Sequence, residues 1–168
     1  MPTNRKLDRR NADDDLVDDV NRRLLLELQD DARLSLAELG RRVGLSAPAV
    51  GERLQRLQEA GAVRGYRAEL DPVVLGFPLG VIIRVRPAAG ELHKVAELAR
   101  QTPEVVECHR ITGEDCFFMK LHLRDVGHME EVIDRFLLYG QTTTSIVQSS
   151  PVPARGLPLD PGGGQPSG

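Results

Sequence analysis

Hydrophobic residues recur at helical spacing in three short segments through the first third of the chain. Asp18 has the residue type and position of an N-cap for the first helix, which should end near Asp31. The apolar face of this helix is formed by Val20, Leu24, Leu25 and Leu28. Ser35 and Glu38 then have the spacing of a capping box, in which each side chain satisfies a free backbone N–H group at a helix start. This spacing predicts a second helix that runs to about Val43.

A third helix is predicted directly after a tight turn. Gly44 tolerates a positive φ in that turn, and Ser46 can cap the helix that follows. The helix should cover residues 47–59 and stop before Gly61. Its inward positions are Val50, Leu54 and Leu57. Its expected outward positions are Ala49, Glu52, Arg53 and Arg56. Residues 63–70 then predict a two-stranded wing that presents Arg64 and Arg67.

The second half of the chain alternates between strand and helix periodicity. The predicted elements are a strand over 81–85, a helix over 92–99, strands over 105–111 and 116–123, a helix over 126–137 and a strand over 142–149. This β-α-β-β-α-β order is typical of a ferredoxin-like domain, in which both helices cover one face of an antiparallel sheet. The other face is then free to pair with another subunit, so we expect a homo-oligomer.

Composition divides the chain into regions. Residues 1–16 are polar and predict a disordered arm, and the proline- and glycine-rich residues 151–168 predict a disordered tail. Proline and glycine over residues 72–78 indicate a linker. It separates a winged helix-turn-helix domain over 17–71 from a ferredoxin-like domain over 79–150, so the predicted fold class is α+β.

The charge distribution says more than the net charge of −3. Residues 33–68 hold seven arginines against three glutamates, whereas residues 77–149 hold eight basic and ten acidic residues. Positive charge is therefore concentrated in the predicted helical region, and a basic surface is what phosphate binding requires.

Two short helices joined by a glycine turn fit the major groove of DNA when the second helix begins with small residues. Ala47, Pro48 and Ala49 satisfy that requirement. We expect Arg53 and Arg56 to contact bases or phosphates. The other predicted contacts are Arg41, Arg42, Ser46, Glu52, Arg64 and Arg67. A plain three-helix bundle has the same periodicity, and the local arginine excess favours DNA binding over that alternative.

Several motifs, in order and at matching spacing, resemble the leucine-responsive and asparagine-operon regulator (Lrp/AsnC) family over residues 16–150. They are LQDDARLS at 28–35, VGLS at 43–46, RLQRL at 53–57 with AG at 60–61, GY at 65–66, LDP at 70–72, ECH at 107–109 and TG at 112–113. The resemblance implies a DNA-binding transcriptional regulator that dimerises through its second domain, often with four dimers in a ring. It also implies a small-molecule effector, commonly an amino acid, bound between subunits near the hairpin loop.

The effector site implied by the resemblance is Thr112, Gly113, Glu114, Asp115 and Cys116. Many family members have an aspartate at the position of Cys116, where it receives the ammonium group of the effector. Asp115 stands one residue earlier, and because side chains alternate faces along a strand, its carboxylate should point the other way. The effector could therefore be an amino acid or an atypical small molecule, and the sequence leaves both alternatives open. Asn21 and the segment Tyr139-Gly140-Gln141 are further departures from the family pattern.

Membrane, secreted and metal-binding proteins find little support in the sequence. No apolar stretch approaches the roughly 20 residues of a membrane span, and no apolar run follows the basic N-terminus, so we expect a cytoplasmic protein. Cys108 and His109 should face opposite sides of a strand, which makes Cys108, His109, Cys116 and His122 a poor metal site. No cofactor is expected.

Three further alternatives are an enzyme, a reversible disulfide and a binding protein that does not contact DNA. Glu114 and Asp115 form an acidic pair, but no nucleophile–base pair or phosphate loop accompanies them, so we expect no enzyme. A reversible bridge between Cys108 and Cys116 across the hairpin is geometrically conceivable. A stand-alone small-molecule-binding or assembly protein without DNA binding is the remaining alternative function.

Overall fold

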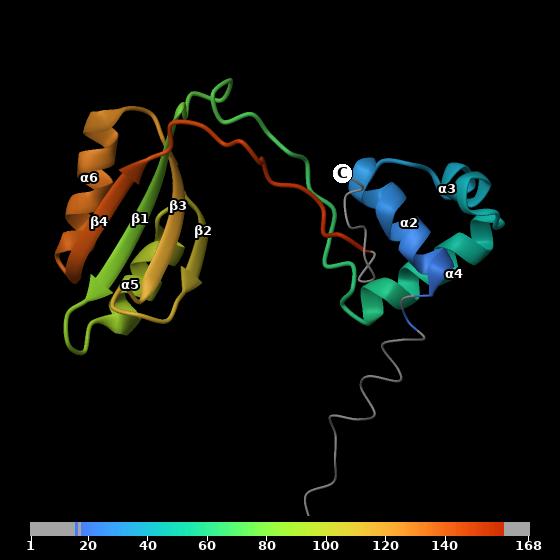
Figure 1. The fold of residues 1–168 in the computed structure, drawn as a ribbon, viewed down its shortest axis with the longest axis horizontal. Helices are drawn as coiled ribbons and strands as arrows, with labels where there is room; N and C mark the ends of the chain where they lie inside the picture. Colours follow the sequence, from blue (N-terminus) through green and yellow to red (C-terminus); the bar gives the residue numbers. More distant parts are fainter. Residues whose placement is uncertain (1–15, 17, 160–168) are drawn as a thin grey trace, which may run out of the picture. The chain divides into compact units, whose positions relative to one another are not determined.

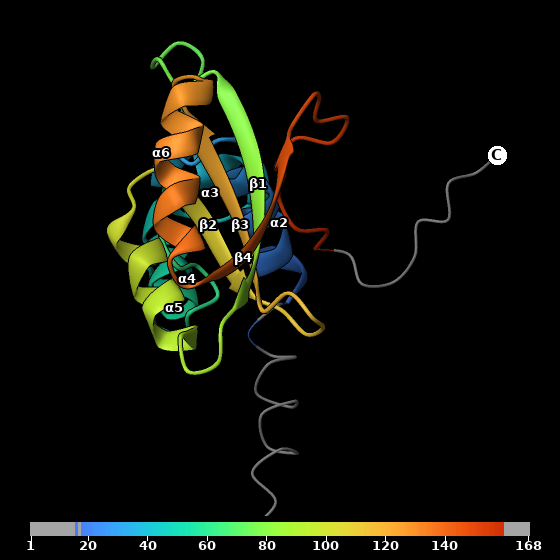
Figure 2. The same ribbon diagram turned by 90° about the vertical axis from the view of Figure 1, so that its left-hand side faces the viewer.

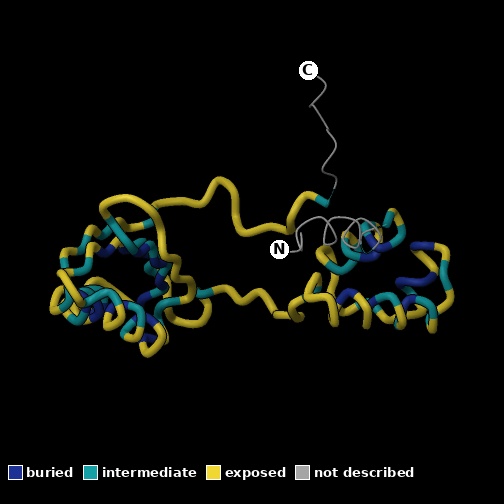
Figure 3. Tube along the Cα trace, turned by 90° about the horizontal axis from the view of Figure 1, so that it is seen from below, coloured by how far each residue is buried: buried dark blue, intermediate teal, exposed yellow. Residues whose placement is uncertain are grey.

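The computed structural model describes residue 16 and residues 18–159. The chain divides into two compact units, one formed by Met1–Ala68 with Ala154–Gly168 and the other by Glu69–Pro153. We call them the helical unit and the sheet unit. Their buried residues form two separate clusters, joined by exposed stretches of chain (Figure 3). The expected arm lies outside the described residues except for Leu16, as does the expected tail from residue 160 onward.

The helical unit contains α2 (Asp19–Asp30), α3 (Leu36–Val43) and α4 (Ala47–Glu59), which confirms the three predicted helices (Figure 1). Each begins at the predicted cap. The side chains of Asp18, Ser35 and Ser46 accept backbone N–H groups three residues later, over 2.7, 3.2 and 3.4 Å. The buried core of the unit is Leu24, Leu39, Val43, Val50, Leu54 and Leu57.

The turn between α3 and α4 is tight because two glycines remove steric obstacles. Gly44 has a φ of 79°, in the left-handed region that favours glycine. The carbonyl of Gly40 accepts the N–H groups of both Gly44 and Leu45, each over 2.8 Å. A Cβ atom on Gly40 would lie 2.3 Å from the carbonyl oxygen of Leu45, so α3 and the turn approach closely enough to exclude any side chain there.

The predicted wing is wrong: among the described residues, 64–70 contain no strand. The residues directly after α4 terminate that helix by hydrogen bonding to its last turn. Gly61 has a φ of 76°, and the N–H groups of Ala62 and Val63 donate to the carbonyl of Leu57 over 2.9 and 3.2 Å. The remaining residues before Asp71 are too few, because two short strands and a two-residue turn need about eight.

The sheet unit has the predicted β-α-β-β-α-β order. Its elements are β1 (Leu79–Pro87), α5 (Leu92–Gln101), β2 (Val105–Arg110), β3 (Phe117–Leu123), α6 (Val126–Leu137) and β4 (Gly140–Ile146). The strands lie in the order β2-β3-β1-β4, with every neighbouring pair antiparallel. Relative to the expectation, β4 begins two residues earlier and ends three residues earlier. Residues 72–77, within the predicted linker, form a turn closed by the Phe77 N–H group and the Pro72 carbonyl at 2.8 Å.

Both helices of this unit cover the same face of the sheet (Figure 2). Val81, Ile83 and Val85 of β1 are fully buried in one cluster with Val95 of α5 and Phe136 of α6. The alternate residues of β1 lie on the opposite face, which we call the open face. They include Ile82, Arg84 and Arg86. The strand period of two therefore presents arginines to solvent on the side away from the helices.

Candidate nucleic-acid interface and hairpin loop

The start of α4 presents small residues. Ala47 and Ala49 are half-buried and Pro48 is exposed, and Ser46 caps the helix. Short side chains at a helix start allow the backbone to approach the edges of bases in a major groove. One turn further along, Arg56 and Glu52 lie on an exposed face and pair with each other at 3.1 Å. Such an exposed pair within one helix is weak, so its arginine is available for a stronger partner.

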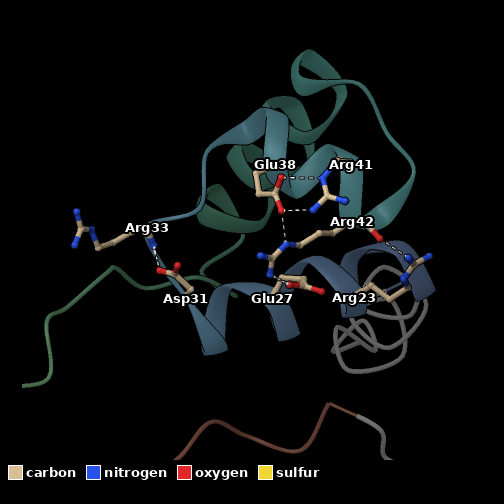
Figure 4. Close-up of polar contacts among 7 residues, drawn as sticks. All are labelled: Arg23, Glu27, Asp31, Arg33, Glu38, Arg41 and Arg42. Atoms are coloured by element: carbon tan, nitrogen blue, oxygen red, sulfur yellow. Dashed lines mark hydrogen bonds and ion pairs between the residues drawn. The ribbon is translucent and has the colours of Figure 1, made fainter.

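A network of ion pairs connects α3 to α2 (Figure 4). Arg42 contacts Glu38 at 2.8 Å and Glu27 of α2 at 2.6 Å, and Arg41 contacts Glu38 at 2.6 Å. The two arginines hold the pKa of Glu38 at about 2. Arg23 of α2 donates to the carbonyl of Arg42 at the end of α3, over 2.7 Å. Arg42 therefore joins helices, whereas the side chain of Arg41 is 73% exposed.

Only one of the two hydrogen bonds of the expected capping box is present. Ser35 accepts the N–H group of Glu38 as predicted, over 3.2 Å. The Glu38 carboxylate is instead bound by the guanidinium groups of Arg41 and Arg42. Charged partners make stronger hydrogen bonds than a neutral backbone amide, which explains the difference.

Arg53 does not face outward as predicted. Its Nη1 atom donates to Asp18 Oδ2 over 2.7 Å and to Asn21 Oδ1 over 3.1 Å, so the side chain lies against the start of α2. Partial burial raises the pKa of Asp18, but the Asn21 N–H group and the Arg53 guanidinium outweigh it and the pKa lies below its ordinary value. Sequence reasoning identified Asp18 as a helix cap and missed its second role. No local signal connects it to a residue 35 positions away.

Arg64 and Arg67 are exposed, but on an extended segment rather than a hairpin. The segment returns to α4 at Tyr66, whose hydroxyl oxygen accepts a hydrogen bond from Gln58 Nε2 over 3.2 Å. The helical unit therefore presents Arg41, Arg56, Arg64 and Arg67 to solvent, while Arg42 and Arg53 are engaged between helices.

The hairpin loop between β2 and β3 contains the predicted effector residues. Ile111 donates to the carbonyl of Cys116, and the N–H group of Cys116 donates to the carbonyl of Val85, each over 3.0 Å. Thr112, Gly113 and Glu114 are exposed, and Asp115 and Cys116 are half-buried. Gly113 has a φ of 112°, a conformation that other residues rarely adopt.

Both carboxylates of this loop are paired with arginines on the open face of β1. Asp115 lies 3.5 Å from Arg84 and 4.0 Å from the Nε atom of Arg86, and Glu114 also pairs with Arg86. Asp115 is the less exposed of the two carboxylates, at 22% against 83%. The loop acids are thus partly neutralised within the unit. Sequence reasoning missed Arg84 and Arg86, although their alternation with buried residues was a usable signal.

A hollow of about 360 Å³ lies between α5 and the edge strand β2. Ala96 and Ala99 of α5 and Phe117 of β3 supply apolar lining. Cys108 also faces it; burial raises the pKa of its thiol, and the nearby Arg100 opposes that shift. The charged residues that line it are Arg100, Glu107 and Arg110. An apolar floor with charges of both signs at the edge suits a small zwitterion or carboxylate.

The geometry of the hairpin excludes the conceivable disulfide between Cys108 and Cys116. Cys108 pairs with Met119 and Cys116 lies opposite Ile111, so they stand three positions apart along the hairpin. That is about 10 Å, beyond the roughly 7 Å that a disulfide spans between Cα atoms. Within residues 18–159, no three His, Cys, Asp or Glu side chains are placed to hold a metal ion. Nor does this part of the chain contain a helix long and apolar enough to cross a bilayer.

Comparison with known proteins matches both units. Residues 17–58 match the AsnC-type helix-turn-helix domain, and residues 80–157 match the Lrp/AsnC ligand binding domain. The HTH-type transcriptional regulator LrpC of Bacillus subtilis is 30% identical over 133 residues, which cover 79% of this chain and 92% of that protein. The leucine-responsive regulatory protein of Klebsiella pneumoniae is 32% identical over 73% of this chain and 76% of its own length.

Solved structures show the same arrangement of elements. The structure of B. subtilis LrpC has a TM-score of 0.77 at 30% identity and covers 79% of this chain and 95% of that one. A transcriptional regulator from Neisseria meningitidis in complex with L-Met has a TM-score of 0.79 at 29% identity, covering 85% and 97%. The helix-turn-helix, the βαββαβ sheet unit and these relatives agree: the chain belongs to the Lrp/AsnC family of DNA-binding transcriptional regulators, which are not enzymes.

Proposed function

We propose that this regulator binds a pseudo-palindromic DNA site as a homodimer, with one α4 helix in the major groove of each half-site. The observation that carries the proposal is the start of α4, where Ala47, Pro48 and Ala49 leave the backbone accessible. Two copies related by a two-fold axis require half-sites about one helical turn apart, or a multiple of it. Because the regulators it resembles include bacterial proteins, we propose the cytoplasm as its compartment.

The proposed DNA contacts are the arginines that are exposed and that can exchange their partners within the helical unit for DNA. Arg56 is paired only within its own exposed helix face, so it can exchange Glu52 for a base or a phosphate. Arg41, Arg64 and Arg67 are exposed and are proposed to contact phosphates. Ser46 and the small residues after it set the depth of insertion.

The test is an electrophoretic mobility shift with DNA from upstream of the protein's own gene, at several salt concentrations. The logarithm of the binding constant should fall with the logarithm of salt by about 0.9 per phosphate contacted. Arg56→Ala should weaken binding and reduce that slope, while Lys94→Ala, at an exposed position of the sheet unit outside the hollow, should change neither. A wild-type chain that retards no DNA at low salt would contradict the proposal and favour a stand-alone binding protein.

We propose that the dimer forms through the open face of the sheet, and that dimers can assemble further into a ring of four. Phe118 of β3 pairs with Arg84 of β1 on that face, and with Ile82 it supplies apolar area that is half-buried in the single chain. Phe118→Asp should give a monomer in sedimentation velocity. Leu138→Asp, at a side chain 77% exposed after α6, is the matched control and should leave the assembly intact.

We propose a small amino acid or related carboxylate as effector, bound beside the hairpin loop of residues 112–116. Two observations support it: relatives are described in complex with L-methionine, and the hollow joins an apolar floor to Arg110 at the base of this loop. Calorimetry with L-methionine should show binding that Arg110→Ala weakens and Lys94→Ala, elsewhere on the surface of the sheet unit, does not. Equal affinity for both variants would exclude Arg110 from the site.

A further inference from the structure

One polar contact fastens the middle of α4 to the start of α2. The two oxygens of Asp18 are divided between two tasks. Oδ1 accepts the N–H group of Asn21 and caps α2, over 2.7 Å, while Oδ2 accepts the guanidinium of Arg53 on α4, also over 2.7 Å. A residue that caps one helix therefore also binds another.

Asn21 completes the contact. It is 6% exposed, its Oδ1 atom accepts from the same Nη1 atom of Arg53 over 3.1 Å, and its Nδ2 atom donates to the Leu16 carbonyl over 2.7 Å. The amide thus uses its acceptor and a donor at once, which fixes its orientation. The guanidinium meets one charged and one neutral acceptor, both held in place by α2.

This pair differs from the other arginine pair of α4. The side chains of Arg53 and Asp18 are 28% and 39% exposed, against 63% and 72% for Arg56 and Glu52. The first pair joins residues 35 positions apart, and the second joins residues of one helix. A partly buried pair between helices loses less to solvent screening and restrains their relative position.

We infer that Asp18, Asn21 and Arg53 form a clamp that sets the orientation of α4 for entry into the major groove, which makes Arg53 a positioning residue rather than a DNA contact. The inference rests on the proposed DNA binding. A straight helix is oriented when it is held at two separated points. The turn at Gly40 and Leu45 holds the start of α4, and Arg53, about 10 Å further along the helix, supplies the second point.

Two single substitutions separate the clamp from its other roles. Asp18→Ser retains a hydroxyl that can cap α2 and removes the charged partner of Arg53, leaving only the neutral acceptor Asn21. Arg53→Met retains an apolar stem and removes the guanidinium. Each should weaken specific binding to the operator roughly tenfold, and the double variant should be no weaker than either single variant, because all three remove the same ion pair.

Salt dependence provides the readout that a DNA contact would change. Neither Asp18→Ser nor Arg53→Met should alter binding to non-specific DNA or the slope of affinity against salt. Arg56→Met is the matched control on the same helix, and it should reduce the slope by about 0.9 for each phosphate that Arg56 binds. Circular dichroism and thermal unfolding establish that every variant is folded.

Two outcomes would overturn the clamp. One is loss of binding in Arg53→Met with full binding in Asp18→Ser, since Arg53 would then act on DNA directly. The other is a reduced salt slope in Arg53→Met. A wild-type chain that binds no DNA contradicts the proposed function instead. In that case the double-mutant cycle in thermal unfolding still decides whether the pair couples α2 to α4, with the Glu52–Arg56 cycle as its reference.

Discussion

The carboxylate of Asp115 lies 3.5 Å from the guanidinium of Arg84, which connects the hairpin loop to the open face of the neighbouring strand β1. The Nε atom of Arg86 lies 4.0 Å from the same carboxylate. Asp115 therefore stands between two cations, and its side chain is 22% exposed. The loop proposed to meet the effector is restrained by charge as well as by its backbone.

Removing that charge should loosen the loop with little change in global stability. Asp115→Asn should increase amide hydrogen exchange over residues 111–116, because the neutral amide holds the arginines less strongly. The free energy of unfolding should change by less than about 1 kcal/mol, because both arginines are nearly half exposed and solvent screens the pairs. Glu114→Gln is the control, since its carboxylate is 83% exposed and should leave exchange nearly unchanged. Equal exchange in both variants would show that the Asp115 pairs do not restrain the loop.

The two helical glycines of the helix-turn-helix should respond to alanine with opposite signs. In Gly40→Ala, the new Cβ atom meets the Leu45 carbonyl oxygen at 2.3 Å, so the turn must open, and we expect a loss of about 1–3 kcal/mol. In Gly51→Ala, the Cβ atom meets the Leu36 side chain at 3.4 Å, and we expect a gain of about 0.5–1 kcal/mol from helix propensity. Thermal unfolding measures both. A stable Gly40→Ala variant would contradict the close approach.

The elements that the sequence predicted well are those fixed by neighbouring residues. The turn at Gly44 and the caps at Ser35 and Ser46 depend on residues within a few positions, so their chemistry is visible in the sequence. The alternation along β1 likewise separates Val85 from Arg86 without knowledge of the rest of the fold. Local rules of conformation were therefore sufficient for the order of helices and strands.

The features that the sequence did not predict depend on contacts between distant segments. Helical periodicity gives the direction of Arg53 from the axis of α4, but the position of Asp18 beside it depends on how α2 packs. The pairing of Asp115 with Arg84 depends on the register of β1 against β3, which a single sequence does not specify. The prediction of a wing was wrong for a local reason, because the chain up to Val63 hydrogen-bonds to the end of α4.

Acid should weaken the sheet unit through Glu104. Its Oε1 atom lies 3.0 Å from Nε2 of the buried His128, whose Nδ1 accepts the Arg124 N–H group over 3.3 Å, so Nε2 donates to Glu104. Its own backbone N–H group and His128 lower the pKa of Glu104 below the ordinary value of 4.5, against the opposite effect of partial burial. A carboxyl with a lowered pKa stabilises the fold above the pKa of the unfolded chain, and this contribution is lost as pH falls through the folded pKa.

We therefore expect the free energy of unfolding to decline below about pH 4.5, and Glu104→Gln to remove part of that decline. The measurement is denaturant unfolding between pH 3 and 7, followed by the amide signals of β3. Glu130→Gln, at an exposed position of α6, is the control and should retain the wild-type pH profile. An unchanged profile in Glu104→Gln would contradict the assignment.

The thiol of Cys108 should react slowly for a residue that is exposed. Burial raises the pKa of the thiol, and Arg100 opposes that rise, so a smaller fraction is thiolate at pH 8 than in a free cysteine. Alkylation by iodoacetamide should accordingly be slower than for N-acetylcysteine. Arg100→Gln should slow it further, by about two- to threefold, because the opposing charge is gone. Lys94→Gln, on the same helix but outside the hollow that Cys108 and Arg100 line, should leave the rate unchanged. Mass spectrometry of the labelled peptide follows the rate, and faster alkylation in Arg100→Gln would show that this arginine screens the thiol sterically instead of stabilising its thiolate.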